Sequence, residues 1–517
     1  MSFSGLGRRL DRFAHRYMPD PFVLAILLTL LVAILGIIFG SSFEPDTHLI
    51  DRLRTTISSW KAFIFEPKRP DGSTNKGLLY FAFQMCLMLV TGHALAASPP
   101  VANVVRRVAR LASNARTGVS LTALVACTMA LLHWGLGLIV GAMIAREVGR
   151  SLKTRNIAHH YPLIGAAGYT GLMVWGTGLS GSIPLAAAGQ KGIPLESTML
   201  SSTNLLIAGV LLFVIPIVAG LLAPSPDEFK PFPHELAPEF EIETSPSPIV
   251  GWFALGLALA GFGATLWALS GYITGTSTTI YAIVDGVIVA AVLHRIVNVA
   301  TATQQRLPGD STPAQYLEQH PILVLIPVIM GLGWLQMEVL EQQFKLSFNN
   351  LNFAFLFLGL LFQGSIPRYV AAISQGAQGC AGIILQFPFY FGILGIMLAT
   401  GLGSVIASGM AAVADATTYP VLTYLSAGLV NLVVPSGGGQ WVVQGAIVTE
   451  GAAAFPDIIP KAILALAFGD AWTNMLQPFW AVPLLAITGL RARDIIGYTG
   501  AIMLVGGAVT ITLLLVL

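Results

Sequence analysis

Long apolar runs constrain this chain more than any other feature of its sequence. Each run is close to the length of about 20 residues that an α-helix needs to cross the hydrocarbon core of a bilayer. Within lipid every backbone N–H and C=O must find a partner inside the protein, so runs of this length predict membrane-spanning helices. About eleven such runs lie at residues 21–40, 78–97, 163–187, 203–223, 248–271, 279–298, 321–338, 351–366, 382–400, 460–487 and 496–517.

The composition agrees with a polytopic membrane protein. Only 10% of the 517 residues are charged, whereas soluble domains average about 25%. No basic run interleaved with aromatic residues indicates nucleic-acid binding. The cysteines Cys86, Cys127 and Cys380 are far apart, so neither a disulfide framework nor a zinc site is expected. No small-residue cleavage site follows the first apolar run, which is therefore interpreted as a first helix rather than a removed signal.

Two further apolar regions, residues 119–148 and 420–453, are interrupted by glycines at their centres. Basic residues flank the first region on both sides, in the segments 106–116 and 146–155. Because short cytoplasmic loops are enriched in Lys and Arg, both ends of this region are expected in the cytoplasm, which makes it a re-entrant hairpin. Counting crossings onward, the second region is a re-entrant hairpin that opens from the opposite face. The prediction is an all-α polytopic membrane protein with about eleven transmembrane spans and two re-entrant hairpins.

A weak internal repeat relates the two halves of the chain. The sequence HWGLG at residues 133–137 corresponds to PSGGG at 435–439, and the segment 168–185 corresponds to 469–485, both at an offset of about 300. Seven predicted crossings separate the two copies, and an odd number inverts the second copy relative to the first. Inverted repeats with discontinuous helices are typical of secondary transporters.

The repeat divides the chain into three parts, and each repeat contains one hairpin and one broken helix. Residues 1–223 are the first repeat, residues 224–310 hold an acidic, proline-rich linker and an extra pair of helices, and residues 311–517 are the second repeat. The broken helices are expected at 163–187 and 460–487.

The two hairpin tips are the first candidates for a binding site. Irregular backbone at membrane depth is tolerated only where it is buried in protein or lines a wet cavity. Glycine lets backbone N–H groups approach a ligand, and the amino end of the returning helix attracts an anion. The alternative is that the glycines only permit close helix packing. The candidate substrate-binding residues are His133, Gly135 and Gly137 in the first tip, and Asn431, Ser436, Gly437, Gly438, Gly439, Gln440 and Trp441 in the second.

The two broken helices add hydroxyl and amide groups to the same region. WGTGLSGS, residues 175–182, has too many glycines for a regular helix interior, where each costs about 1 kcal/mol relative to alanine. DAWTNMLQPFW, residues 470–480, is broken at Pro478. The candidate substrate-binding residues here are Thr177, Ser180, Ser182, Thr473, Asn474 and Gln477. The candidate walls of the site are Trp134, Trp175, Trp441, Trp472 and Trp480.

Asp470 is the main candidate for ion coupling, together with Asn474 and Thr177. Carboxylates inside a membrane are costly and often serve this purpose. The alternative for Asp470 is an interfacial position near the start of its helix. His133 has two readings as well, because it can bond a carboxylate or carry a proton, or be a neutral imidazole bonded to a backbone carbonyl. No metal site and no cofactor are expected, apart from Na⁺ as one of two coupling ions considered.

Several motifs resemble one known family. MPDPFVLAILLTLL, WGLGLIVGAMIAREV, VPSGGGQWVVQG and MLQPFWAVPLLAITGL are similar to the bacterial short-chain fatty acid transporter family, whose reference member is a permease for acetoacetate and other short-chain acids. The resemblance covers about 1–223 and 311–517, and residues from about 245 to 310 are extra relative to shorter members. It implies a place in the ion transporter superfamily, whose members of known architecture are dimers. Each protomer there has a scaffold domain and a transport domain with two opposed hairpins, and most are thought to move as elevators.

Together these features favour a secondary active transporter of butyrate, acetoacetate and similar monocarboxylates in the bacterial cytoplasmic (inner) membrane. We expect a homodimer in the lipid bilayer, working as a symporter driven by H⁺ or Na⁺. The tips and breaks contain no Lys or Arg, which disfavours a dicarboxylate. The alternatives are a transporter of another small organic anion or a cation/proton antiporter of the same architecture. An enzyme is disfavoured because neither a G-x-S-x-G nor an H-E-x-x-H motif is present.

Overall fold

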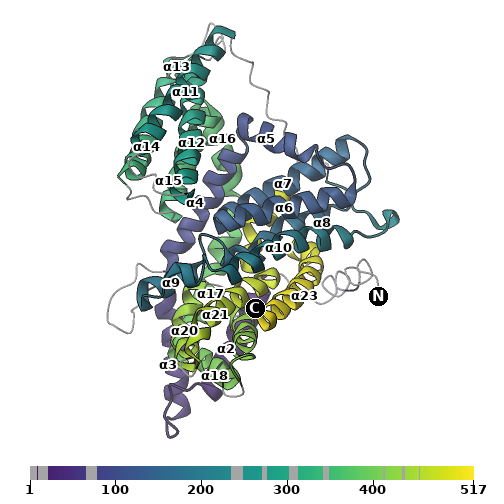
Figure 1. Cartoon of the computed structure of the whole chain (residues 1–517), viewed down its shortest axis with the longest axis vertical. Coiled ribbons are helices and arrows are strands. Elements are labelled where there is room, and N and C mark those ends of the chain that lie inside the picture. The colour runs from purple at the N-terminus through teal and green to yellow at the C-terminus, as the bar shows by residue number, and fades with distance from the viewer. Residues whose placement is uncertain are drawn as a thin grey trace. The chain divides into compact units, whose positions relative to one another are not determined.

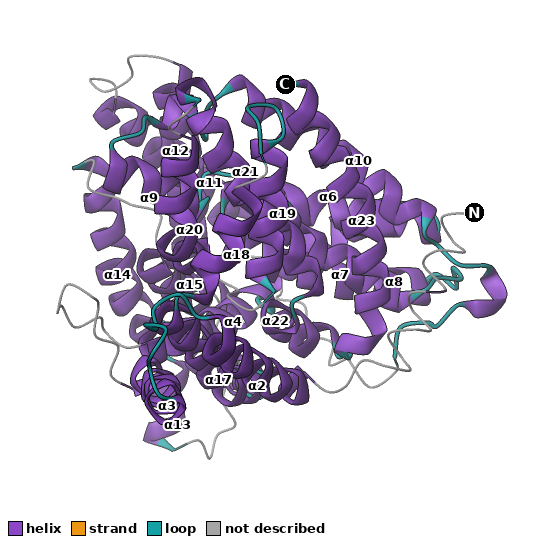
Figure 2. Cartoon of the chain, turned by 90° about the horizontal axis from the view of Figure 1, so that it is seen from below, coloured by secondary structure: helices purple, strands orange, loops and turns teal. Residues whose placement is uncertain are grey.

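The structure is a computed structural model that describes residues 9, 21–65, 78–233, 248–269, 276–301, 312–341, 348–411, 414–432, 437–452 and 455–517. Within these residues all regular structure is helical, and Figure 2 shows helices and connecting loops with no strand. The all-α prediction is therefore confirmed for the described part of the chain.

The helices belong to two compact units, each described here by itself. One unit contains Met1–Met85, Val105–Ala237 and Gly379–Leu517, and the other contains Cys86–Val104 and Pro238–Gln378. The helices of the first unit are α2 (Pro21–Phe39), α3 (Leu49–Phe65), α6 (Ala115–Leu132), α7 (Trp134–Thr154), α8 (Tyr161–Tyr169), α9 (Ser182–Lys191), α10 (Ser202–Leu221), α17 (Cys380–Thr400), α18 (Leu402–Ala411), α19 (Tyr419–Asn431), α20 (Gly437–Gly451), α21 (Ile459–Thr473), α22 (Pro478–Thr488) and α23 (Ala492–Val516). Those of the second are α11 (Pro248–Leu269), α12 (Thr276–Thr301), α13 (Pro313–Gln319), α14 (Ile322–Leu340), α15 (Phe348–Gln363) and α16 (Ile366–Ala377), while α4 (Leu78–Ala96) and α5 (Pro99–Ala109) cross the boundary.

The apolar runs of the sequence became helices. Within the described residues seven helices are long and apolar enough to cross a membrane, and α4 with α5, bent by 78°, is an eighth candidate. Six of the seven coincide with predicted spans, namely α10, α11, α12, α14 (continuous with α13), α17 and α23. The seventh is α6, the first arm of the first predicted hairpin, whose 18 residues reach the length of a full span. The total of about eleven crossings, and the re-entrant path of the hairpins, stay predictions.

Helices α6 and α7 form an antiparallel hairpin around the first glycine-rich tip, and Figure 1 shows them side by side. Near the tip, a Cβ on Gly137 would collide with Ala130, and one turn further along a Cβ on Gly141 would lie 3.1 Å from the Ala126 side chain. Small residues thus line the seam between the two arms, as they do where membrane helices approach each other closely.

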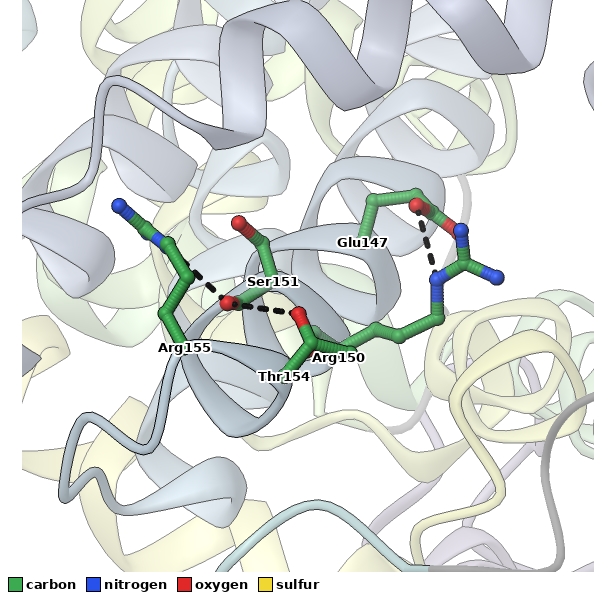
Figure 3. Close-up of polar contacts among 5 residues, drawn as sticks. All are labelled: Glu147, Arg150, Ser151, Thr154 and Arg155. Atoms are coloured by element: carbon green, nitrogen blue, oxygen red, sulfur yellow. Dashed lines mark hydrogen bonds and ion pairs between the residues drawn. The ribbon is translucent and has the colours of Figure 1, made fainter.

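At the base of this hairpin, polar contacts tie the end of α7 to the chain before α6. The Arg155 guanidinium donates to the Ala112 carbonyl at 2.5 Å and to the Ser151 carbonyl at 3.1 Å. Arg150 forms an ion pair with Glu147 at 3.4 Å, one turn back on the same helix (Figure 3). The basic cluster that predicted a cytoplasmic hairpin base therefore also holds that base together.

Helices α19 and α20 form a second antiparallel hairpin around the three glycines. The Tyr419 hydroxyl donates to the Val448 carbonyl at 3.0 Å at the open end. Nearer the tip, Gln440 Nε2 donates to the Ala427 carbonyl at 2.7 Å. The two arms of this hairpin are thus joined by hydrogen bonds from side chains to backbone carbonyls, whereas small residues line the contact between the arms of the first hairpin.

Each hairpin is followed by a broken helix that packs against it. Helix α8 gives way to two short 3₁₀ turns, Thr170–Met173 and Trp175–Thr177, before α9 begins, and α21 gives way to the turn Asn474–Leu476 before α22. Both breaks fall in the segments that the sequence indicated. A Cβ on Gly171 would lie 2.6 Å from the Ala126 carbonyl in α6, and a Cβ on Gly428 in α19 would lie 2.8 Å from the Trp472 ring in α21.

Helix α3 was not predicted, because its face alternates apolar with charged and hydroxyl residues and gives no continuous apolar run. It packs against α17, where Gly392 and Gly395 leave room for the Trp60 and Phe63 rings. The charged and hydroxyl residues between its apolar positions keep the hydropathy of α3 low, so the sequence gives no sign of it.

In the second unit, two buried charged side chains have hydrogen-bond partners on neighbouring helices. Asp285 in α12 accepts from Gln336 Nε2 in α14 at 2.9 Å. Arg295, 7% exposed, donates to the Phe362 carbonyl of α15 at 2.8 Å. Asp285 thus has a structural partner in Gln336.

A short strap after α10 is held by two adjacent histidines at the start of α8. His160 Nδ1 accepts from the Lys230 backbone N–H at 3.2 Å, and His159 Nε2 accepts from the Phe232 N–H at 3.1 Å. A backbone N–H can only donate, so both rings must be neutral at these nitrogens. Burial lowers the pKa of His160 to about 4 and lowers the pKa of His159.

This strap predicts a stability loss in acid. Both histidine pKa values are lower in the folded protein, so their contribution is complete above the unfolded value near 6.5 and falls as pH drops toward 4. Each histidine then costs up to about 1.4 kcal/mol per pH unit. We expect the melting temperature of the detergent-solubilised protein to fall between pH 6.5 and 4, and less steeply for His160→Asn, which keeps an acceptor near Nδ1 but does not titrate. Equal slopes for both proteins would contradict this role.

Candidate functional site

The first tip is closed by its own histidine. His133 is the one residue between α6 and α7, with extended backbone (φ −158°, ψ 131°) and a 2% exposed side chain. Its Nδ1 accepts from the Gly135 N–H at 3.1 Å, so the ring caps the start of α7. Gly137 donates its N–H to the His133 carbonyl at 3.0 Å. The backbone N–H groups of Gly135 and Gly137 therefore form hydrogen bonds within the first tip itself.

The first break is hydrogen-bonded to the first tip. Ser180 Oγ accepts from the Trp134 N–H at 2.9 Å, and the Leu179 N–H donates to the Leu131 carbonyl at 2.8 Å. The Thr177 hydroxyl donates to the Val174 carbonyl of the same segment at 2.6 Å. Of the predicted ligands in this break, Ser180 and Thr177 thus have structural partners.

The second tip meets the same break from the other side. Helix α20 begins at Gly437, and Ser436 lies outside the described residues. A Cβ on Gly437 would collide with Ser182 Oγ and would lie 3.0 Å from the Trp175 ring and 3.1 Å from Asp470 Oδ2. Only glycine allows this approach, so the amino end of α20 is seated directly on Ser182, Trp175 and Asp470.

The next residue, Gly438, has open space at its Cβ position. A Cβ on Gly438 would have no atom within 4 Å, and the residue is exposed. It belongs to the first turn of α20, where backbone N–H groups point out of the helix and the dipole is positive. The Cβ position of Gly438, in the first turn of α20, is therefore open among the described residues.

Asp470 is buried without a partner. Its side chain belongs to a residue that is 1% exposed, and neither carboxyl oxygen has a hydrogen bond among the described residues. Ser182 Oγ and Trp175 Nε1 beside it are likewise buried without one. Asp470 lies in the last turn of α21 rather than near its start. Burying an unpaired carboxylate costs several kcal/mol. The α20 dipole would stabilise that carboxylate by roughly 2 kcal/mol at most. The neutral carboxyl form therefore fits this arrangement.

The second break is held by a network of hydrogen bonds from side-chain amides and one tyrosine hydroxyl. Asn431 Nδ2 donates to Thr473 Oγ1 and to Asn474 Oδ1, both at 2.9 Å. Gln477 Nε2 donates to the Asn431 carbonyl, and the Tyr169 hydroxyl donates to the carbonyls of Asn474 and Gln477 at 2.9 and 2.6 Å. These four predicted ligands bind one another, and they fix the end of α19 to the break.

Three of the five predicted wall tryptophans gather beside the tips. The Trp134 ring lies 5.1 Å from Trp480 and 6.5 Å from Trp175, both edge to face. Trp441 packs instead in the apolar cluster around Ile183 and Ile463, and Trp472 donates its Nε1–H to the Met503 carbonyl at 2.8 Å. The apolar wall next to the amino end of α20 is therefore Trp134, Trp175 and Trp480.

Other buried residues support the site and were not predicted. Asn204 Nδ2 donates to the Thr177 carbonyl at 2.9 Å and holds the first break. Gln444, one turn after Gln440, accepts from Gln440 Nε2 at 2.9 Å and donates to Ser426. The i, i+4 spacing of the two glutamines in an apolar helix is the signal that identifies such a pair.

The contact between Ser180 and the first tip gives a stability prediction. Ser180→Ala leaves the buried Trp134 N–H without an acceptor, which costs about 1–3 kcal/mol, and the melting temperature in detergent should fall. Ser58→Ala is the matched control, because the exposed Ser58 hydroxyl bonds only the Thr55 carbonyl of its own helix. Equal melting temperatures for the two variants would show that the Trp134 contact contributes nothing.

Comparison with known proteins identifies the family. The family described as short chain fatty acid transporter matches residues 2–245 and 281–517. A protein assigned as a short-chain fatty acid transporter in Escherichia coli (strain K12) is 33% identical over 512 residues, which cover 98% of this chain and 97% of that protein. One with the same assignment in Haemophilus influenzae is 31% identical over 510 residues, 96% of this chain and 95% of that protein. The solved Alcanivorax borkumensis YdaH transporter is 15% identical with a TM-score of 0.34, over 96% of this chain and 98% of that one, a similarity too low to use.

The match leaves only a short internal segment unassigned. Residues 246–280 lie outside it and include α11, whereas most of α12 lies within it. Both relatives align with nearly the full length of this chain. The family is one of transporters, so the chain is not an enzyme, and its apolar helices make it a multi-pass protein of the bacterial inner membrane. The chain belongs to the short chain fatty acid transporter family.

Proposed function

We propose that this chain is a secondary active transporter of short-chain monocarboxylates such as butyrate and acetoacetate. The observation that carries the proposal is the second tip, where the amino end of α20 is open at Gly438 beside a tryptophan wall. Helix amino ends bind carboxylates without a cationic side chain. The short acyl chain would lie against Trp134, Trp175 and Trp480.

Charge supports a monoanion over a dianion. No Lys or Arg occurs in either tip or either break, and a second carboxylate would be buried with nothing to offset its charge. The only carboxyl group in contact with the amino end of α20 is Asp470, among the described residues. The second carboxylate of a dicarboxylate would add another negative group at this place, at a cost that one helix dipole does not balance.

Helix bounds support the inverted repeat. Helix α2 (Pro21–Phe39) precedes α14 (Ile322–Leu340) by 301 residues at both ends, and α4 precedes α17 by 302 at its start. The contacts between hairpin and broken helix repeat at about the same offset. Ala126 contacts Gly171 in the first half, and Gly428 contacts Trp472 in the second.

An elevator movement and a dimer complete the proposal. Both hairpins, both breaks and Asp470 belong to one compact unit, and a site carried whole by one unit is what an elevator movement needs. The coupling ion is H⁺ or Na⁺, with Asp470 as its acceptor. Whether two protomers assemble is tested by the mass of the detergent-purified protein.

Counterflow tests this function. Proteoliposomes are preloaded with unlabelled butyrate, acetoacetate or succinate at pH 8, where little protonated acid leaks, and labelled butyrate is added outside. Butyrate and acetoacetate inside should accelerate entry of label at least tenfold over protein-free liposomes, and succinate should not. Label entry equal to that of protein-free liposomes for every preload would reject the proposed function.

A further inference from the structure

The arrangement at the second tip puts two anions in competition for one helix end. Asp470 Oδ2 lies 3.1 Å from the Cβ position of Gly437, the first residue of α20. The proposed substrate carboxylate binds at Gly438, the next residue. A carboxylate on Asp470 and a carboxylate on the substrate would therefore share the same positive end of the dipole and repel each other at close range.

Asp470 is closely packed on the side that faces the amino end of α20, and its carboxyl has no hydrogen-bonding partner among the described residues. Gly437 is packed so tightly on Ser182, Trp175 and Asp470 that even a Cβ does not fit. A cation held by oxygen atoms needs several ligands, whereas a proton needs only the carboxyl oxygen itself and one acceptor. Ser182 Oγ is buried beside the same Gly437 and has no other partner, so it is the natural acceptor for a protonated Asp470.

No other charge stabilises an ionised Asp470. The elements that pack against α21 are α9, α19, α20, α23 and the adjoining 3₁₀ turns. Their charged side chains, with those of α21 itself, are Lys191, Glu450, Asp457, Lys461, Arg493 and Asp494. None of these forms a hydrogen bond with the Asp470 carboxyl, whose two oxygens have no partner among the described residues.

We propose that Asp470 carries the coupling proton, and that the substrate carboxylate and an ionised Asp470 exclude each other at the amino end of α20. One proton then enters with each monocarboxylate, and the cycle is electroneutral. The proton binds Asp470 on the side of higher proton concentration, the neutral carboxyl lets the tip close on Ser182, and reopening to water on the other side releases both proton and substrate. This inference rests on the proposed transport function.

The test separates exchange from accumulation. Asp470→Asn mimics the protonated acid permanently. In proteoliposomes it should keep butyrate counterflow within about threefold of wild type and lose accumulation driven by an inward pH gradient. Asp285→Asn is the matched control, since Asp285 is a buried aspartate with its own partner in Gln336, and it should accumulate butyrate like wild type. Protein-free liposomes give the leak of butyric acid, which is subtracted throughout.

Several outcomes overturn the inference. Accumulation by Asp470→Asn at the wild-type level would do so, as would wild-type accumulation on a Na⁺ gradient but not on a pH gradient. If Asp470→Asn does not fold, the wild-type gradients decide alone, and Asp470→Glu should restore accumulation on the pH gradient. Absence of wild-type counterflow is a different result, which rejects the proposed function and this inference with it.

Discussion

Gly438→Val is expected to lower butyrate uptake at least tenfold while the protein reaches the membrane in normal amount. A valine side chain fits at this position, because a Cβ there meets no atom within 4 Å. It would cover the backbone N–H groups that form the proposed site for the substrate carboxylate. A tenfold loss corresponds to about 1.4 kcal/mol, close to one hydrogen bond to a charged group. Uptake of labelled butyrate per unit of reconstituted protein measures the effect.

The matched control is Gly209→Val in α10. Gly209 is also a helical glycine with open space at its Cβ position, and it lies in the same unit away from both tips. Its variant carries the same cost of a β-branched residue in a helix and should transport normally. Full uptake by Gly438→Val would remove Gly438 from the binding site.

Gly168→Val is expected to abolish folding rather than transport alone. Gly168 in α8 and Gly141 in α7 pack backbone to backbone, and a Cβ on Gly168 would lie 2.5 Å from the Gly141 carbonyl oxygen. That atom belongs to a helix and cannot rotate away, so the broken helix must separate from the hairpin. Overpacking of this kind costs about 3 kcal/mol or more.

Size-exclusion chromatography in detergent, followed by a melting curve, measures that effect. Gly168→Val should run as aggregate or melt far below wild type, while Gly209→Val should resemble wild type in both. A monodisperse Gly168→Val protein with the wild-type melting temperature would show that α8 and the first hairpin are not closely packed.

Local sequence signals predicted much of the architecture. Apolar runs gave the long helices because lipid leaves the backbone no other partners. Clustered glycines indicated the first tip and the break at 175–182, and Pro478 indicated the second break, since these residues weaken a regular helix. Helix α3 was not predicted, because its contacts with α17 depend on glycines more than 300 residues away in the sequence.

The roles of individual polar residues could not be predicted in the same way. Ser180 and Ser182 are two positions apart, yet Ser180 accepts from Trp134 while Ser182 meets Gly437 from the other hairpin. Gln440 was expected to face the ligand, and its amide nitrogen donates to the Ala427 carbonyl across the hairpin. Such outcomes depend on which segments pack together, and sequence spacing does not encode that. The burial of Asp470 has the same origin, since α20 covers it.

The most direct test of the binding site is protection of a single cysteine by substrate. Gly438→Cys is placed in a background where Cys86, Cys127 and Cys380 are serine, and its reaction rate with a membrane-permeant maleimide is measured with and without butyrate. The account predicts that butyrate slows labelling of Gly438→Cys severalfold and saturably, and leaves Gly209→Cys unaffected. An unchanged rate at Gly438→Cys in saturating butyrate would contradict binding at the amino end of α20.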